Sequence, residues 1–183
     1  MPTIEEHKKQ SIEQRLQRLG RTADDLAAAI HGQSDAGLSR RPGPKKWSAK
    51  EVVCHLRDIE ELFMLRFHYM LGTDGPIFLV LAEMPPDPER WGIGGRVGMP
   101  LNPDRWAEER QYLRNDTALA LSAFCNRREE TLALLRKLSP AQWQRGSTHV
   151  TLGRMTFEDW VALMAAHDDK HLGQLKRALE GRA

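Results

Sequence analysis

The sequence has little of what marks secreted, membrane-spanning or redox-active proteins. It contains 2 cysteines, Cys54 and Cys125, whose wide separation excludes a CxxC metal or redox motif. Both lie in apolar surroundings, which is typical of reduced core residues in a reducing compartment. The N-terminal MPTIEEHKKQ lacks the apolar run of a signal peptide, and no stretch of about 18 apolar residues could span a bilayer. We therefore expect a cytoplasmic protein without a membrane partner.

An excess of charge of either sign is also missing. Lys and Arg total 27 against 25 acidic residues, so the formal net charge is +2. Nucleic-acid binding needs clustered cations for phosphate contacts, and the tightest basic cluster, residues 40–46, is interrupted by prolines and a glycine. We interpret that cluster as a solvated loop and expect no nucleic-acid partner. The 183 residues show no internal repeat and fit a single domain, residues 1–183.

What the sequence does contain is a set of long segments with helical periodicity. Apolar residues recur at spacings of three and four over residues 12–30, 48–71, 117–138 and 156–180. Ser48 and Glu51 have the pattern of a capping box at the start of the second segment, and Thr156 and Asp159 have a weaker one at the start of the fourth. No comparable set of alternating strand segments is present, so the sequence predicts an all-α protein, a four-helix bundle. Minor elements are expected at residues 77–80 or 150–152 (extended) and 139–142 (a short helix).

Residues 72–115 interrupt this pattern with several prolines, so no long helix can run through them. We expect them to form a long crossover between the second and third helices, with a helical turn or two at residues 104–113. Connections this long are often lids over a site. On that interpretation Glu83, Asp87 and Trp91 would reach the site. The alternative is a crossover that only joins two helices.

The fourth segment contains the residues that suggest chemistry. His167 and His171 are four positions apart, so their rings project from one face of a helix, about a turn from each other. Steps of about 100° per residue place both within the apolar stripe of that segment. Two core histidines would each need a separate hydrogen-bond partner, whereas a shared divalent ion satisfies both rings at once. The pair alone leaves both interpretations open.

His55, in the second segment, is a third candidate ligand. It lies at the flank of the apolar stripe near the start of its helix. In an antiparallel bundle that end can face the middle or C-terminal part of another helix. The remaining histidines fit less well: His7 is in a charged terminal run, His31 lies past the first stripe, His68 is at a polar edge and His149 is in a turn-like segment.

The runs WSAKEVVCHL (residues 47–56) and HDDKHLGQL (residues 167–175) resemble the second- and fourth-helix signatures of the DinB-like (damage-inducible) metal-binding proteins. The resemblance implies a four-helix bundle whose metal is held by one histidine of the second helix and two of the fourth, here His55, His167 and His171. Many proteins of that family are homodimers, several are metal-dependent transferases that use a low-molecular-weight thiol, and others resemble hydrolases. A homodimer is therefore an expectation for this chain.

A site with three histidine ligands leaves coordination positions open, which distinguishes catalytic from structural metal sites. Such a site suits zinc, nickel or iron. Our leading hypothesis is a divalent-metal-binding enzyme that activates a low-molecular-weight thiol for transfer to a small electrophilic substrate. The alternatives are a metal-dependent hydrolase and a non-catalytic metal-binding or stress-response protein.

Other polar side chains are candidates for supporting roles. Asp58, three residues after His55, is expected to orient that ring or to act as a catalytic base. Arg128 interrupts the apolar stripe of the third segment and is a candidate for binding a cofactor carboxylate. Its alternative is an arginine whose charged end extends to solvent. Asp168 and Asp169 are expected to be exposed.

Overall fold

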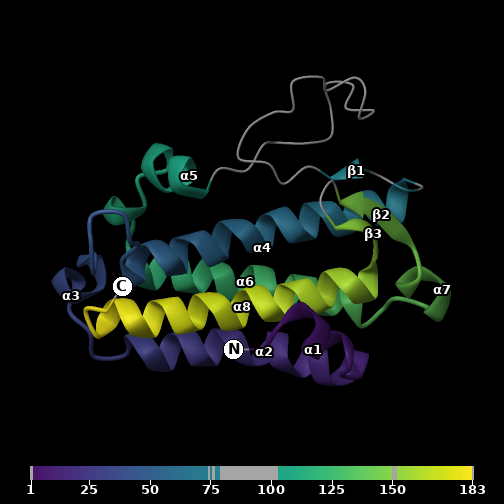
Figure 1. The fold of residues 1–183 in the computed structure, drawn as a ribbon, viewed down its shortest axis with the longest axis horizontal. Coiled ribbons are helices and arrows are strands. Elements are labelled where there is room, and N and C mark those ends of the chain that lie inside the picture. The colour runs from purple at the N-terminus through teal and green to yellow at the C-terminus, as the bar shows by residue number, and fades with distance from the viewer. Residues whose placement is uncertain (1, 74, 76, 79–102, 150–151, 183) are drawn as a thin grey trace.

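The chain folds around long helices that lie side by side (Figure 1). The computed structural model describes residues 2–73, 75, 77–78, 103–149 and 152–182. The long helices begin and end close to their predicted bounds: α2 spans Ile12–Ile30, α4 spans Ala49–Gly72, α6 spans Thr117–Leu135 and α8 spans Phe157–Leu179. The predicted four-helix bundle is therefore confirmed.

The packing order of the bundle explains the long crossover. α4 packs against both α6 and α8, and α2 packs against the same two helices. α4 and α6 start at the same end of the bundle, near α3 (Asp35–Ser39) and the C-terminus, so these neighbours run parallel (Figure 1). Parallel neighbours cannot be joined by a short turn. The chain between Gly72 and Thr117 must therefore return along the length of the bundle.

Capping boxes fix the starts of the two helices that carry the candidate ligands. The Glu51 amide donates to the Ser48 hydroxyl at 3.3 Å, and the Ser48 amide donates to the Glu51 carboxylate at 2.9 Å. Thr156 and Asp159 form the same reciprocal pair at the start of α8. Both boxes satisfy N–H groups that the first turn of a helix leaves without intrahelical partners. The histidines consequently hold defined positions along α4 and α8.

A small three-stranded sheet closes one end of the bundle (Figure 1). β1 (Ile77–Phe78) pairs in parallel with β2 (Gly146–His149), which pairs antiparallel with β3 (Gly153–Thr156). An extended piece at residue 77 was predicted, whereas the β2–β3 hairpin was not. The predicted short helices are confirmed as α5 (Pro103–Glu109), the 3-10 helix η2 (Tyr112–Arg114) and α7 (Pro140–Trp143). Two further short helices, α1 (Ile4–Lys8) and α3, were not predicted.

Apolar side chains of the four long helices form two buried clusters. One contains Phe63 and Trp160, and the other contains Cys54 and Leu175. Removing such side chains from water contributes about 25 cal/mol per Å² of apolar surface, which is the main force that holds helices together. Cys54 and Cys125 are free thiols, as predicted. None of the described helices combines the length and apolarity that crossing a membrane requires.

Candidate metal centre

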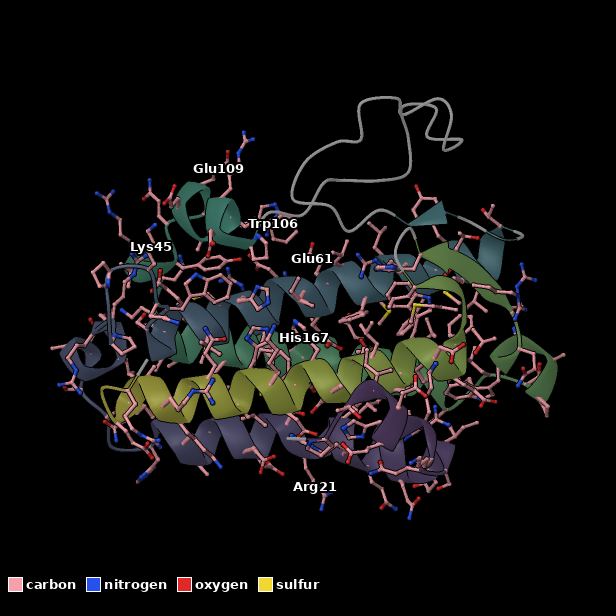
Figure 2. The ribbon with its side chains drawn as sticks, in the orientation of Figure 1. Arg21, Lys45, Glu61, Trp106, Glu109 and His167 are labelled. Carbon is pink, nitrogen blue, oxygen red and sulfur yellow. The ribbon has the colours of Figure 1, made fainter. Side chains whose placement is uncertain are left out.

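The three predicted ligands meet between α4 and α8. His55 lies in the second turn of α4, and His167 and His171 lie on successive turns of α8. These helices pack directly against each other, and Figure 2 shows His167 between their ribbons. The centroids of the three rings are 4.3 to 5.3 Å apart. The bundle therefore brings the whole predicted triad together.

Nitrogen atoms of the triad have the spacing of ligands around one ion. Nε2 of His55 and Nε2 of His167 lie 3.3 Å apart, and the candidate ligand atoms of all three rings lie within 4.8 Å of one another. A tetrahedral ion with metal–nitrogen bonds of about 2.0–2.1 Å holds its ligand nitrogens roughly 3.3–3.4 Å apart. The separation between His55 and His167 therefore matches one edge of such a site.

Hydrogen bonding around the triad also fits a cation. Nδ1 of His171 lies 2.8 Å from the acceptor Oε1 of Gln174, so Nδ1 carries the proton and Nε2 keeps its lone pair. Nδ1 of His55 and Nδ1 of His167 are buried and have no hydrogen-bond partner in the described part of the chain. A buried nitrogen without a partner costs about 1–3 kcal/mol. The unpaired Nδ1 atoms are therefore a cost of burial, and they are distinct from the facing Nε2 atoms of the same two rings, which would coordinate an ion.

Burial keeps the three rings neutral near neutral pH. It lowers the pKa of His55 and of His167 well below the usual histidine value, and the charge of His171 lowers both further. Burial also lowers the pKa of His171 to about 4, with a further contribution from the charge of Lys170. Neutral imidazole is the form that coordinates a metal. The donor set and its protonation state thus suit a divalent ion.

The triad lies in the wall of an open cavity of about 600 Å³. This volume is within the range of small-molecule sites, about 300–1,000 Å³. Trp47 packs against His55 with ring centroids 4.8 Å apart, and its Nε1 donates to Oδ1 of Asp104 at 2.9 Å. Ile59 and Phe63 extend the same wall along α4. A small molecule in this cavity would contact the triad and an apolar surface beside it.

Asp58 belongs to a different group of side chains. Its carboxylate accepts hydrogen bonds from Arg57 at 2.7 Å and from Arg110 and the Tyr112 hydroxyl at 2.8 Å each. Burial raises the pKa of Asp58, but these donors lower it more, and the net value lies below the usual one. A carboxylate held by three donors is a weak base. The structure therefore assigns Asp58 to anchoring η2 on α4, in place of the predicted role beside His55.

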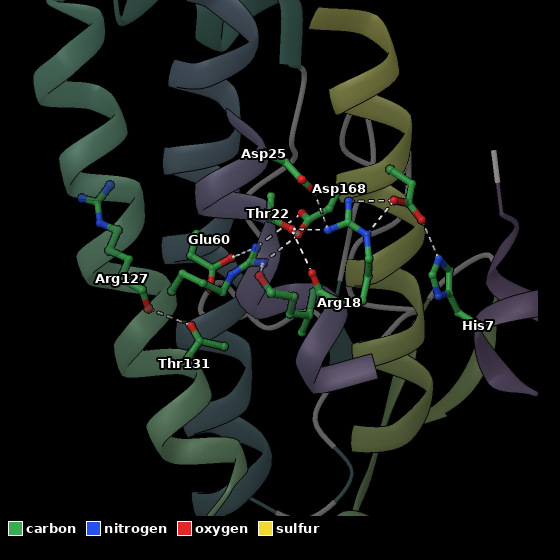
Figure 3. A network of polar contacts seen from close by, with 11 residues as sticks. His7, Arg18, Thr22, Asp25, Glu60, Arg127, Thr131 and Asp168 are labelled. Atoms are coloured by element: carbon green, nitrogen blue, oxygen red, sulfur yellow. Dashed lines mark hydrogen bonds and ion pairs between the residues drawn. The ribbon is translucent and has the colours of Figure 1, made fainter. Parts of the chain in front are cut away.

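Arg128 lies inside the bundle and not at the cavity. It donates to Asp168 and to Glu60 at 2.7 Å each, and to the Leu19 carbonyl at 2.8 Å. Figure 3 shows the network that surrounds these two carboxylates. Neither a cofactor carboxylate nor solvent is its partner, so the structure corrects both interpretations of Arg128.

Asp168 was expected to be exposed, and this prediction was wrong. Its relative exposure is 2%, and besides Arg128 it accepts a hydrogen bond from the Thr22 hydroxyl at 2.7 Å. The reason is that α8 packs against α1, α2 and α4, so more than one of its faces is buried. Asp169 is partly buried and pairs with Arg18 at 2.7 Å.

Arg66 and His149 line the cavity but were not predicted. Arg66 lies seven residues after Ile59 on α4, so its place on the apolar stripe was a usable indication. His149 was expected in a turn away from the site, and it is instead the last residue of β2. No local pattern could have placed it, because the hairpin depends on contacts with α8. The predicted lid residues lie outside the described part of the chain: Glu83, Asp87 and Trp91.

Fold and site together define a helical bundle with a cluster of three histidines between two of its helices that could hold a metal ion. The sequence pattern of the DinB superfamily matches residues 18–175. The chain therefore belongs to the DinB superfamily.

Two related sequences and one solved structure share low sequence identity with this chain. An uncharacterized protein of Bacillus subtilis, YuaE, is 20% identical over 151 residues, which cover 82% of this chain and 88% of the relative. A protein of Oceanobacillus iheyensis, named as a candidate metal-dependent hydrolase, is 24% identical over 168 residues, which cover 92% of this chain and 81% of the relative. The structure of YfiT from Bacillus subtilis is described as a probable metal-dependent hydrolase with an unusual four-helix bundle topology. It matches with a TM-score of 0.74 and 22% identity, and the match covers 96% of this chain and 92% of YfiT. At this identity the structural likeness shows the shared fold.

Proposed function

We propose that this chain is a metal-dependent enzyme that holds one divalent ion, zinc, nickel or iron, through His55, His167 and His171. The proposal rests on the convergence of three neutral imidazoles in the wall of a cavity large enough for a substrate. Structural sites close the metal shell with four protein ligands, whereas catalytic sites keep a position for water or substrate. Three ligands beside an open cavity favour the catalytic type.

Hydrolysis of a small molecule is the reaction we favour. Two related proteins carry names or descriptions of metal-dependent hydrolases, which supports this choice. A bound divalent ion supplies Lewis acidity, which activates a nucleophile near neutral pH. The chain's own residues hold and shield the centre. Gln174 orients the His171 ring, Trp47 packs against the His55 ring, and Phe63 packs against the His167 ring.

Thiol transfer is the second candidate, with a low-molecular-weight thiol in place of water as the nucleophile. The observation that favours it is the positive charge of the cavity rim, which would attract a thiol that carries a carboxylate. The rim cations are Lys45, Lys46, Lys170, Arg177 and Arg182. In both candidates the partner of the protein is a small molecule.

Metal content is the decisive test of the site. The untagged parent protein, after reconstitution with zinc and removal of excess metal, is expected to retain about one equivalent by elemental mass spectrometry. His171→Ala should retain far less. His68→Ala is the matched control, because His68 is an exposed histidine on α4 outside the triad. Equal zinc in parent and His171→Ala, or none in either, would contradict the proposal.

Activity then separates the two reactions. The zinc-loaded protein should hydrolyse activated aryl esters without added thiol if water is the nucleophile, whereas turnover that requires a thiol would favour transfer. Retained metal with turnover of neither kind would favour a non-catalytic metal protein.

A further inference from the structure

The cavity continues from the triad along α4 and α8 to a second group of polar residues. Its wall between the two groups is apolar and includes Phe63, Leu163 and Trp160. At its far end lie Arg66, from α4, and His149, from β2. Trp160 and His167 are seven residues apart on α8, which corresponds to roughly 10 Å along a helix. The polar group therefore lies about two helical turns from the triad.

Arg66 is a buried cation supported by aromatic faces. Its relative exposure is 6%. The guanidinium carbon lies 5.0 Å from the ring centroid of Trp160 and 5.5 Å from that of Phe63, an arrangement that favours a cation over the ring faces. Burial lowers the pKa of Arg66 to about 10, so the side chain still carries its charge near neutral pH. Such a guanidinium offers planar donors that match the two oxygens of a carboxylate.

His149 approaches the same indole from the sheet. Its ring centroid lies 5.7 Å from that of Trp160, and Trp160 is itself fixed by a 2.7 Å hydrogen bond from Nε1 to the Ser147 hydroxyl. Nδ1 of His149 accepts the backbone N–H of Leu152 at 3.1 Å. The neutral ring therefore carries its proton on Nε2, where it is a donor. Arg66 and His149 thus bring two donors to one aromatic platform.

The side chains of the cavity wall carry mostly positive charge. Among the described residues that line it, the only carboxylate is that of Asp104, which accepts a hydrogen bond from Trp47. The cationic side chains in the wall are Lys45, Lys46, Arg66, Lys170, Arg177 and Arg182. A cavity with this bias attracts anions and repels cations. Arg66 differs from the other five because it alone is buried at the apolar end.

We propose that Arg66, assisted by His149, binds the carboxylate of an elongated small molecule whose apolar part lies along Phe63 and Leu163 and whose other end reaches the triad. The proposal deepens the function proposed above and rests on it only for the role of the triad end. The chemistry that recognises the ligand is a single anionic group about 10 Å from the reacting centre, separated from it by an apolar spacer.

Binding of fatty acid probes tests this subsite. Butanoate, hexanoate and octanoate, with hexanamide as the uncharged counterpart of hexanoate, would be titrated into zinc-loaded protein by isothermal titration calorimetry. We expect at least one acid to bind the parent and hexanamide to bind more weakly. Arg66→Met, which keeps the apolar stem, should weaken acid binding by about tenfold or more, because a charge-assisted hydrogen bond is lost. His149→Gln should give a smaller loss.

Arg21→Met is the matched control, since Arg21 is an exposed arginine on α2, on the side of the bundle away from the cavity (Figure 2); it should bind the acid as the parent does. If Arg66→Met fails to fold by circular dichroism, Arg66→Lys serves instead, with an intermediate loss expected because the charge remains and the planar fork does not.

His171→Ala distinguishes this subsite from the metal. Because its Arg66 is intact, it should still bind the acid within a few-fold of the parent. Acid binding that is lost in His171→Ala but unchanged in Arg66→Met would place the carboxylate on the triad and overturn the proposal. So would a parent that binds none of the acids. A parent that retains no zinc but binds the acid through Arg66 would contradict the proposed function and leave the subsite in place.

Discussion

At the scale of single residues, the buried guanidinium of Arg128 links all four long helices, because it also donates to the Leu19 carbonyl on α2. It lies on α6 and reaches Glu60 on α4 and Asp168 on α8. Burial alone would lower the pKa of Arg128, but attraction by the two carboxylates raises it above the usual arginine value. Asp168 directly follows His167. The network therefore limits rotation of α8 and holds the ligand face of that helix toward α4.

Replacement of Arg128 by methionine should be strongly destabilising. The change leaves the Glu60 and Asp168 carboxylates buried without their cation, for which we expect a loss of about 3–5 kcal/mol in the free energy of unfolding. Urea unfolding followed by circular dichroism measures it. Arg127→Met is the control on the same helix: Arg127 pairs with the exposed Glu61, and exposed pairs contribute about 1 kcal/mol or less. Similar losses in the two variants would show that the buried network has no special role.

The residues of the site were predictable to different degrees. His167 and His171 could be identified because two polar rings on an apolar stripe are unusual, and the structure places both beside His55. The burial of Asp168 could not be predicted, because the prediction assumed one buried face for a helix that packs against its neighbours on several faces. The contact of Arg128 with Asp168 could not be predicted either, since a contact between α6 and α8 depends on how the helices assemble into the bundle.

At the scale of elements, the start of α8 should make stability depend on pH. Asp159 closes the capping box, and its carboxylate accepts from the Thr156 amide at 2.8 Å and pairs with Lys8 at 3.1 Å. Burial raises the pKa of Asp159, but these partners lower it more, and the net value is below the usual one. The unfolded chain therefore takes up the proton more readily than the folded one. The stability due to this carboxylate is present above the unfolded pKa, about 3.9, and is lost as the pH falls through the folded value.

Asp159→Asn, which keeps an oxygen acceptor but removes the charge, should lower the free energy of unfolding by about 1 kcal/mol at pH 7, because a negative charge in the first turn of a helix is stabilising. The gap between parent and variant should close as the pH is lowered to about 3, because the parent carboxyl then approaches the neutral state too. Urea unfolding at pH 7, 5 and 3 measures the gap. Asp24→Asn, at an exposed position within α2, should have little effect at any of these pH values. A gap for Asp159→Asn that persists unchanged at pH 3 would rule out the charge as its cause.

The elements themselves show where local rules suffice. The four long helices were predicted nearly to their bounds, because apolar spacing and capping residues act within a few positions of each other. The β2–β3 hairpin was missed, because its strands contain mostly small and polar residues and no alternating apolar pattern. Contacts from elsewhere support it: Trp160 donates to Ser147, and Arg145, just before β2, donates to the Met70 carbonyl at 2.8 Å.

At the scale of the whole molecule, the triad joins the two halves of the chain. His55 lies on α4 before the long crossover, and His167 and His171 lie on α8 after it. An ion shared by these side chains can bind only when α4 and α8 are packed, so it binds the folded state in preference to the unfolded one. Binding of that kind stabilises a protein in proportion to the logarithm of the ligand concentration.

Zinc should therefore raise the thermal unfolding midpoint. At a free concentration of about one hundred times the dissociation constant the gain is roughly 2.7 kcal/mol. For a chain of this size that corresponds to a rise of roughly 5–10 °C, which differential scanning calorimetry measures and a chelator should reverse. His68→Ala should show the same rise, because its triad is intact, whereas His171→Ala should show little. An equal rise in His171→Ala would mean that zinc stabilises the bundle from another site, and the link between the triad and the stability of the whole fold would then be wrong.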